Sequence, residues 1–121
     1  MNQLQTSYAV GGMLQCALWS SVDFDTDEPL DASHGIQDFA PETSKALIAD
    51  LEAFIEANAD DIALSGLTGE AVGHDFWLTR NSHGAGFWDR GLGWLGDRLT
   101  AACKPYGSVD LYVGDDGAIY A

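Results

Sequence analysis

The residues with the greatest capacity for chemistry in this chain lie together in one segment of its second half. Residues 73–90 contain two of the three histidines, two of the four tryptophans and two of the three arginines. Side chains of these types often bind ions or ligands, or hold an unusual backbone in place. We therefore expect this segment either to form a binding site or to fix a demanding local structure.

Metal binding is the first chemistry to consider. The side chains of ligand type in the segment are His74, Asp75, His83 and Asp89. The pattern around residue 75 predicts a strand, in which neighbouring side chains point to opposite faces, so His74 and Asp75 would not share one ion without a bulge. We favour hydrogen bonds to the backbone or ion pairs with Arg80 and Arg90, and we predict no metal site.

Arg80, His83 and Arg90 offer a second possibility, a site for a small anion. The two arginines flank a glycine-rich turn that opens into a predicted helix. Backbone amides at a helix start, together with guanidinium groups, can hold a phosphate or a carboxylate. The turn follows neither of the common nucleotide-binding glycine patterns. We favour the alternative in which the glycines supply positive φ and Asp75 or Asp89 pairs with an arginine.

Catalysis has little support in the sequence. No serine or cysteine stands in a recognisable nucleophile motif, and no close pair of carboxylates lies in an apolar setting. Trp77, Phe87 and Trp88 fit a protein core better than a platform for stacking bases. We therefore name no catalytic residue and no cofactor.

The charge of the chain is strongly negative and unevenly placed. The formal net charge is −14, and residues 1–61 carry twelve acidic side chains against the single Lys45. Phosphate backbones and anionic lipids would repel this half, so we expect neither nucleic acid nor a membrane as a direct partner. The natural complement is a protein with a basic surface, although acidity also keeps proteins soluble.

The most acidic stretch, residues 21–42, is predicted to be a long loop because it is rich in helix breakers and poor in periodic apolar residues. Its alternating aspartates resemble the start of a calcium-binding loop, but the glycine at the sixth position and the glutamate at the twelfth are missing. We expect its carboxylates to contact the basic partner instead of calcium. These residues are Asp23, Asp25, Asp27, Glu28 and Asp31.

The other patterns predict the elements that position these groups. Helices are predicted over residues 2–20, from Thr43 or Ser44 onward and over residues 87–104, and strands over residues 75–80, 109–113 and 118–120. Gly11 and Gly12 could break the first helix. This order predicts a single α+β domain over residues 1–121, with a small sheet of about three strands covered by about three helices.

Cys16 and Cys103 each lie in an apolar helical setting, so we predict buried free thiols, as in a reducing cytosol. No apolar stretch approaches the roughly 20 residues that a membrane helix needs. The N-terminus has no basic flank before an apolar run, so we also expect no secretion signal.

The segment His74-Asp75-Phe76-Trp77-Leu78-Thr79-Arg80-Asn81, followed by His83-Gly84-Ala85-Gly86-Phe87-Trp88-Asp89-Arg90, resembles a family of small acidic proteins from tailed bacteriophages and integrated prophages. The likeness continues through residues 91–93 and 110–117 and includes the Trp19 region and residues 27–30. It implies expression in the cytoplasm of an infected bacterium, and it carries no catalytic residue across.

Small acidic phage proteins often bind and disable host machinery, which is an argument by analogy. Together with the charge, it favours a non-enzymatic protein that binds and inhibits or redirects a host protein. One form is an anti-CRISPR or anti-restriction inhibitor whose acidic surface occupies a nucleic-acid-binding groove. The alternatives are the anion-binding module or small enzyme centred on Arg80, His83 and Arg90, and a virion or morphogenesis component, for which no coiled coil or repeat is present. The oligomeric state is left open, since Phe87 and Trp94 could form a second apolar seam for a dimer or simply contact the N-terminal helix.

Overall fold

The computed structural model describes all residues, 1–121, and is dominated by α-helices. The helices are α1 (Gln3–Ser20), α2 (Pro41–Ala57), α3 (Ala59–Ser65), α4 (Gly69–Arg80) and α5 (Trp94–Cys103). The strands are β1 (Val22–Asp23), β2 (Glu28–Pro29), β3 (Tyr112–Val113) and β4 (Ile119–Tyr120). Short 3-10 helices span Leu30–Ala32, Ile36–Asp38, Phe87–Asp89 and Lys104–Tyr106. The predicted α+β fold with a sheet of about three strands is therefore wrong, because β1–β2 and β3–β4 are two separate antiparallel hairpins.

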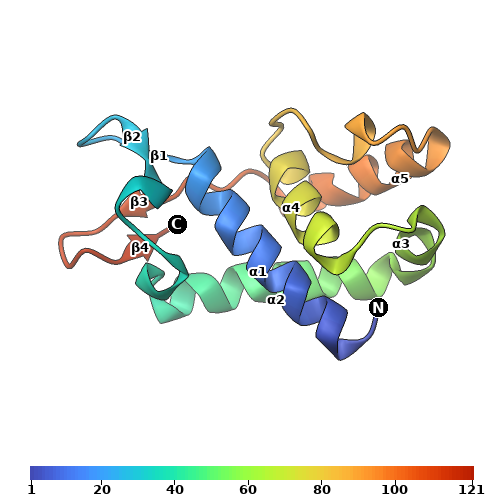
Figure 1. Ribbon diagram of the computed structural model, residues 1–121, viewed down its shortest axis with the longest axis horizontal. Coiled ribbons are helices and arrows are strands. Elements are labelled where there is room, and N and C mark those ends of the chain that lie inside the picture. Colours follow the sequence, from blue (N-terminus) through green and yellow to red (C-terminus); the bar gives the residue numbers. More distant parts are fainter.

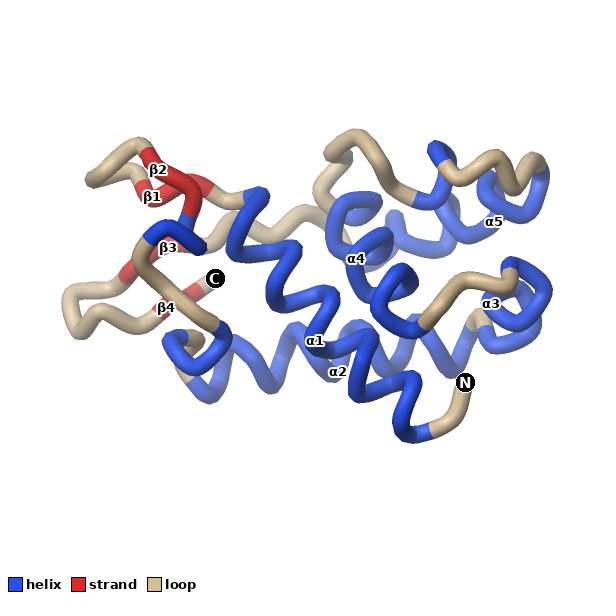
Figure 2. Tube along the Cα trace, in the orientation of Figure 1, coloured by secondary structure: helices blue, strands red, loops and turns tan.

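Figure 1 shows how the elements are arranged. Helix α2 runs along the length of the molecule, α1 crosses it diagonally, and α4 and α5 lie together on one side. Both hairpins lie at the same end, and the rest of the chain consists of helices joined by loops (Figure 2). A parallel bridge between Phe39 and Ile119 ties the last strand to the start of α2.

Helix α4 replaces the strand predicted over residues 75–80. Its N-terminus is capped by Thr68, whose Oγ1 accepts a hydrogen bond from the backbone N–H of Ala71 at 3.2 Å. Nearly every residue in its last two turns is buried, so no polar stripe reveals the helical period. The run of aromatic and apolar side chains was therefore consistent with a central strand as well as with a buried helix.

Helices α1 and α4 pack with their backbones in close approach. A Cβ atom on Gly73 would overlap the carbonyl oxygen of Ala9, and a Cβ on Gly12 would press on the backbone of Glu70. Gly69 lies against α1 in the same way, and its N–H donates a hydrogen bond to the side chain of Gln5. The glycine pair therefore does not break α1, which continues from Gln3 to Ser20. The missing Cβ of Gly12 instead allows α1 and α4 to pack closely.

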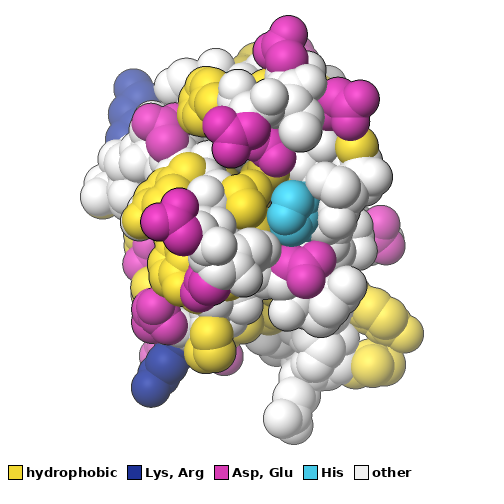
Figure 3. All heavy atoms as spheres, turned by 90° about the vertical axis from the view of Figure 1, so that its left-hand side faces the viewer, with side chains coloured by type: hydrophobic (Ala, Val, Ile, Leu, Met, Phe, Trp, Pro, Cys, Tyr) yellow, Lys and Arg dark blue, Asp and Glu magenta, His cyan; other side chains and the backbone are white.

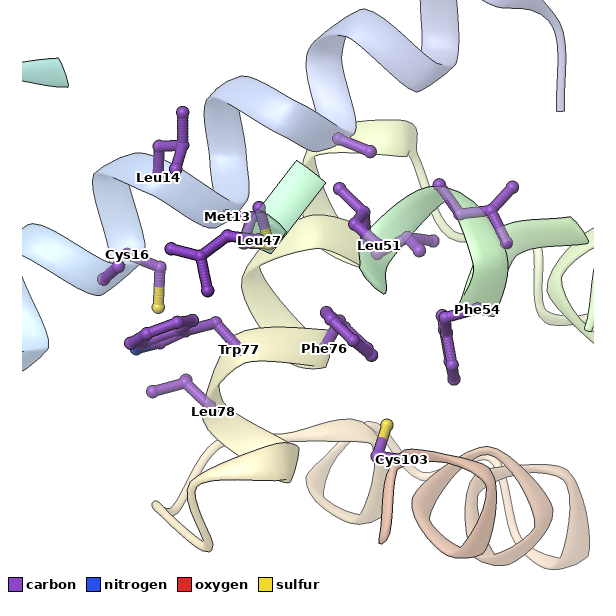
Figure 4. Packing of buried hydrophobic residues seen from close by; sticks show 14 of the residues in the cluster. Met13, Leu14, Cys16, Leu47, Leu51, Phe54, Phe76, Trp77, Leu78 and Cys103 are labelled. Atoms are coloured by element: carbon purple, nitrogen blue, oxygen red, sulfur yellow. The ribbon is translucent and has the colours of Figure 1, made fainter. Parts of the chain in front are cut away.

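The core lies between α1, α2, α4 and α5 (Figure 4). Phe76 and Trp77 of α4 point into it, and the Phe76 ring lies 4.7 Å from that of Phe54 in α2, centroid to centroid. The predicted apolar face of α2 is confirmed: Leu47, Leu51, Phe54 and Ile55 are buried and Ile48 is half-buried. The helix begins earlier than predicted, at Pro41, with Ala40 as the N-cap instead of Thr43 or Ser44.

Two further predictions concern the second half. The helix predicted over residues 87–104 is interrupted, because Gly91 and Gly93 take positive φ between Phe87–Asp89 and α5. The final hairpin is confirmed, with strands of two residues each.

Cys16 and Cys103 are buried free thiols, as expected. No helix has the length and apolar character needed to cross a membrane.

Candidate functional site

The polar residues of the chemistry-rich segment are largely engaged with one another. Asp75 is completely buried, and its carboxylate accepts hydrogen bonds from Arg90 Nε at 2.8 Å and Nη2 at 2.9 Å. His74 Nδ1 lies 2.9 Å from the same carboxylate. The expected pairing of an aspartate with an arginine is thus confirmed for Asp75 and Arg90. The hydrogen bond to Asp75 raises the pKa of Arg90 above its usual value, so the guanidinium stays charged.

Arg80 connects three parts of the chain. It is buried, and it donates hydrogen bonds from Nε to Gly107 O at 2.9 Å, from Nη2 to Tyr106 O at 2.7 Å and from Nη1 to Asp50 at 3.0 Å. The guanidinium carbon lies 5.5 Å from the centre of the Phe76 ring. These contacts fix α4 against α2 and against the chain that follows α5, which is a structural role.

The metal candidates are arranged differently from the strand geometry that we predicted. On a helix, His74 and Asp75 contact each other directly, and Asp89 Oδ2 instead accepts a hydrogen bond from the backbone N–H of Ala85 at 2.7 Å. His83 is exposed. The structure contains no group of three or more His, Cys, Asp or Glu side chains placed to hold a metal ion.

The turn after α4 also differs from expectation. The residues with positive φ are Ser82, at 57°, and Ala85, at 65°, and not the neighbouring glycines. Gly86 is needed for a different reason, because a Cβ there would collide with Thr79 Oγ1 and the Trp88 ring. The prediction that these glycines supply positive φ is therefore wrong.

The structure does not bring Arg80, His83 and Arg90 together. They line three different cavities, of about 380, 310 and 350 Å³ respectively. The Arg80 cavity includes Lys104 and several hydroxyl groups, but the Arg80 side chain is only 2% exposed and has its own partners. The alternative anion site considered for these three residues is thus not assembled.

The five acidic residues named from the sequence do lie close together, on a structured element. Residues 22–31, here called the acidic hairpin, comprise β1, a tight turn, β2 and the first residues of the next 3-10 helix. The turn is closed by a 2.7 Å hydrogen bond from Asp27 N to Asp23 O, and Asp23 Oδ1 accepts another from Asp25 N at 3.0 Å. Asp27 takes a positive φ of 60°, which aspartate tolerates better than most residues. The predicted long loop is therefore a hairpin followed by two 3-10 turns.

The acidic hairpin is held in place at its base and exposed at its tip. Leu30 is completely buried in the core, and its N–H donates a 2.9 Å hydrogen bond to Ser21 O. In the turn, Phe24 is 83% exposed, the largest exposed fraction among the large apolar side chains of the chain. The ring is therefore available to contact another molecule, and aromatic side chains contribute much of the energy of protein interfaces.

The second hairpin adds further negative charge at the same end of the molecule. Asp110, Asp115 and Asp116 are exposed, and Asp110 lines the 310 Å³ cavity together with Phe24 and Val22. Figure 3 views this end and shows acidic side chains spread across it, with Lys and Arg only at its margin. We call the two hairpins together the acidic end.

One carboxylate of the acidic end is tuned by a neighbour. The Tyr120 hydroxyl donates a 2.6 Å hydrogen bond to Asp116, which lowers the pKa of Asp116 and raises that of Tyr120 to about 12. The carboxylate therefore stays ionised in mildly acidic conditions.

Neither the role of Phe24 nor the contribution of the second hairpin was predicted from the sequence. Phe24 carried a usable signal, since a large aromatic residue stood between two aspartates in a stretch predicted to be solvated. The proximity of Asp110, Asp115 and Asp116 to residues 22–31 had no such signal, because it depends on the tertiary fold.

Comparisons of the chain with known protein families, with curated proteins and with solved structures found no match.

Proposed function

We propose that this protein binds a partner protein through the acidic hairpin, at a basic surface that otherwise contacts nucleic acid. The observation that carries this proposal is the position of Phe24, which is 83% exposed in a turn between Asp23 and Asp25. Carboxylates on both sides of an exposed aromatic side chain match a surface rich in arginine and lysine.

The proposed binding rests on the attraction between basic side chains of the partner and the carboxylates and aromatic ring of the hairpin. Arginine side chains bind carboxylates through charge-assisted hydrogen bonds and also stack on aromatic faces, so one basic surface can use both features of the hairpin. Residues 21–44 contain seven acidic side chains and no Lys or Arg, which leaves their field uncompensated locally. Such a field speeds the encounter with a basic protein and repels nucleic acid from the same place.

The biological setting in this proposal follows the resemblance of residues 74–90 to small phage proteins. In that setting the partner is a protein of the bacterial host, in its cytoplasm, and the protein acts as an inhibitor of a nucleic-acid-binding complex such as a CRISPR or restriction enzyme. The inhibitor needs no catalytic group, because occupying the groove is sufficient to exclude the nucleic acid.

The test compares two variants that change the charge equally at different places. The hairpin variant carries Asp25→Asn, Asp27→Asn, Glu28→Gln and Asp31→Asn; all four side chains are exposed. Asp23 is kept because its carboxylate closes the turn. The control variant neutralises four exposed carboxylates outside the acidic end: Glu52→Gln, Glu56→Gln, Asp60→Asn and Asp97→Asn.

Immobilised wild type, hairpin variant and control variant are each exposed to bacterial lysate, and captured proteins are released with a polyanion such as heparin. We expect wild type and control to capture the same basic, heparin-released protein and the hairpin variant to lose it. Phe24→Ala should weaken the capture without changing the charge. Equal capture by the hairpin and control variants, or no heparin-released protein at all, would contradict the proposal.

A further inference from the structure

Helix α1 differs from every other helix in its charge. Its 18 residues contain no Asp, Glu, Lys, Arg or His, whereas α2, α3, α4 and α5 all carry charged side chains. In a chain with a net charge of −14, two copies repel each other over most of their surface. A contact between copies is therefore least opposed at the outer face of α1.

That outer face is apolar and hollowed. Leu4 is 60% exposed, Tyr8 54% and Trp19 46%, and the three lie along one side of the helix. Between Tyr8 and Trp19 a groove of about 390 Å³ passes over Gly11 and Gly12. A Cβ on Gly11 would meet nothing within 4 Å, so this position is open to another chain.

The groove has other borders besides α1. Ile36 and His74 line it, and Glu70 is the one carboxylate among its lining residues. The Trp19 ring lies 5.8 Å from the His74 ring, centroid to centroid, which holds the indole at the edge of the groove. The groove is therefore almost free of charge, unlike the acidic end.

Two pairs of exposed residues in α1 are also spaced symmetrically. Leu4 and Trp19 are equally far from the midpoint between Gly11 and Gly12, and so are Tyr8 and Gln15. A two-fold axis at that midpoint would place Leu4 on the partner's Trp19 and Tyr8 beside the partner's Gln15, with the open Gly11 of each copy near the crossing. We propose that the protein forms a homodimer in which α1 pairs with α1 of a second copy, antiparallel, across this glycine crossing.

The acidic hairpins decide the direction of pairing. Each hairpin begins directly after the C-terminus of α1. At ~1.5 Å per residue the helix is about 27 Å long, so antiparallel pairing separates the two hairpins by several Debye lengths of about 8 Å, and parallel pairing would place them side by side. The antiparallel dimer presents two hairpins at opposite ends and can bind two basic sites at once.

Sedimentation velocity over a range of concentrations tests the dimer. We expect wild type to reach twice the chain mass of 12.9 kDa, and Tyr8→Glu to weaken the self-association at least about tenfold. The control is Leu64→Glu, which adds the same charge at a residue that is 70% exposed on α3. A monomer at every concentration up to ~1 mM, or equal weakening by the two variants, would overturn the proposal.

Disulfide trapping tests the direction. The double variant Tyr8→Cys with Gln15→Cys should give a covalent dimer on mild oxidation, and Tyr8→Cys alone should not. The native Cys16 and Cys103 are buried and do not compete. Efficient cross-linking of the single Tyr8→Cys variant would overturn the antiparallel arrangement. These outcomes do not depend on the acidic hairpin, so the dimer and the proposed function can fail separately.

Discussion

The ion pair between Asp75 and Arg90 gives the sharpest prediction about the chemistry-rich segment. Replacing Arg90 with alanine removes two hydrogen bonds, at 2.8 and 2.9 Å, from a carboxylate that is 0% exposed. Only His74 then remains as its partner. If the segment is structural, as its contacts indicate, this substitution should destabilise the fold strongly.

The size of the loss follows from burial on the two sides of the pair. Breaking a buried ion pair by removing one partner typically costs about 3–5 kcal/mol. The Arg90 side chain is 35% exposed, so water can reach part of the vacated space. We therefore expect the free energy of unfolding to fall by about 2–4 kcal/mol, toward the lower part of the usual range. Asp75→Asn, which keeps the shape and removes the charge, should cost about 1–2 kcal/mol.

Urea unfolding at neutral pH measures these losses, and Arg98→Ala is the matched control. Arg98 pairs with Asp61 at a similar distance, 3.0 Å, but its side chain is 63% exposed, so the loss should be about 1 kcal/mol or less. A loss below about 0.5 kcal/mol for Arg90→Ala, or one equal to that of Arg98→Ala, would refute the structural interpretation.

Three further substitutions or labels probe the packing. Gly73→Ala should destabilise the fold by about 2 kcal/mol or more in urea unfolding, because the clash with the α1 backbone outweighs a gain of about 1 kcal/mol in helix propensity; an unchanged midpoint would contradict the close packing. Leu99→Ala, at a completely buried position, should cost about 2–5 kcal/mol in the same assay, and a loss below 0.5 kcal/mol would place α5 outside the core. Burial raises the pKa of both Cys16 and Cys103 to about 12, so neither should react with a thiol reagent near pH 8 until the protein is unfolded, when both should react. Rapid labelling of the folded protein would show that a thiol is accessible.

The sequence predicts those elements that have one clear apolar face. Residues 41–57 show the spacing of an amphipathic helix, and the last hairpin is marked by the turn Gly114-Asp115-Asp116-Gly117. Both are present in the structure. Their patterns were informative because one side of each element faces water.

Helix α4 is the element whose type was wrongly predicted from the sequence pattern. It is buried nearly all round, so its hydrophobicity has no period, and its dense aromatic run resembles a strand. The signals of a helix were Thr68 as a cap and the two glycines, Gly69 and Gly73, spaced by four. These glycines have meaning only against α1, which is a long-range contact that local propensity does not contain.

The candidate site was predictable in part. The five acidic residues were identified from charge alone, and they lie on one hairpin. Their structured turn and the exposure of Phe24 depend on Leu30, which anchors the hairpin in the core. The contacts of Arg80 with Tyr106 and Gly107 were equally hidden, since they join residues more than 25 positions apart.

The most direct test of the proposed function is to locate the carboxylates that contact the captured partner. A zero-length carbodiimide cross-linker joins a carboxylate only to an amine in direct contact, and mass spectrometry identifies both residues. We expect cross-links from Asp25, Asp27, Glu28 or Asp31 to partner lysines, lost when nucleic acid is added first. Cross-links confined to Glu52, Glu56 or Asp60, or ones that nucleic acid does not displace, would contradict binding through the acidic hairpin.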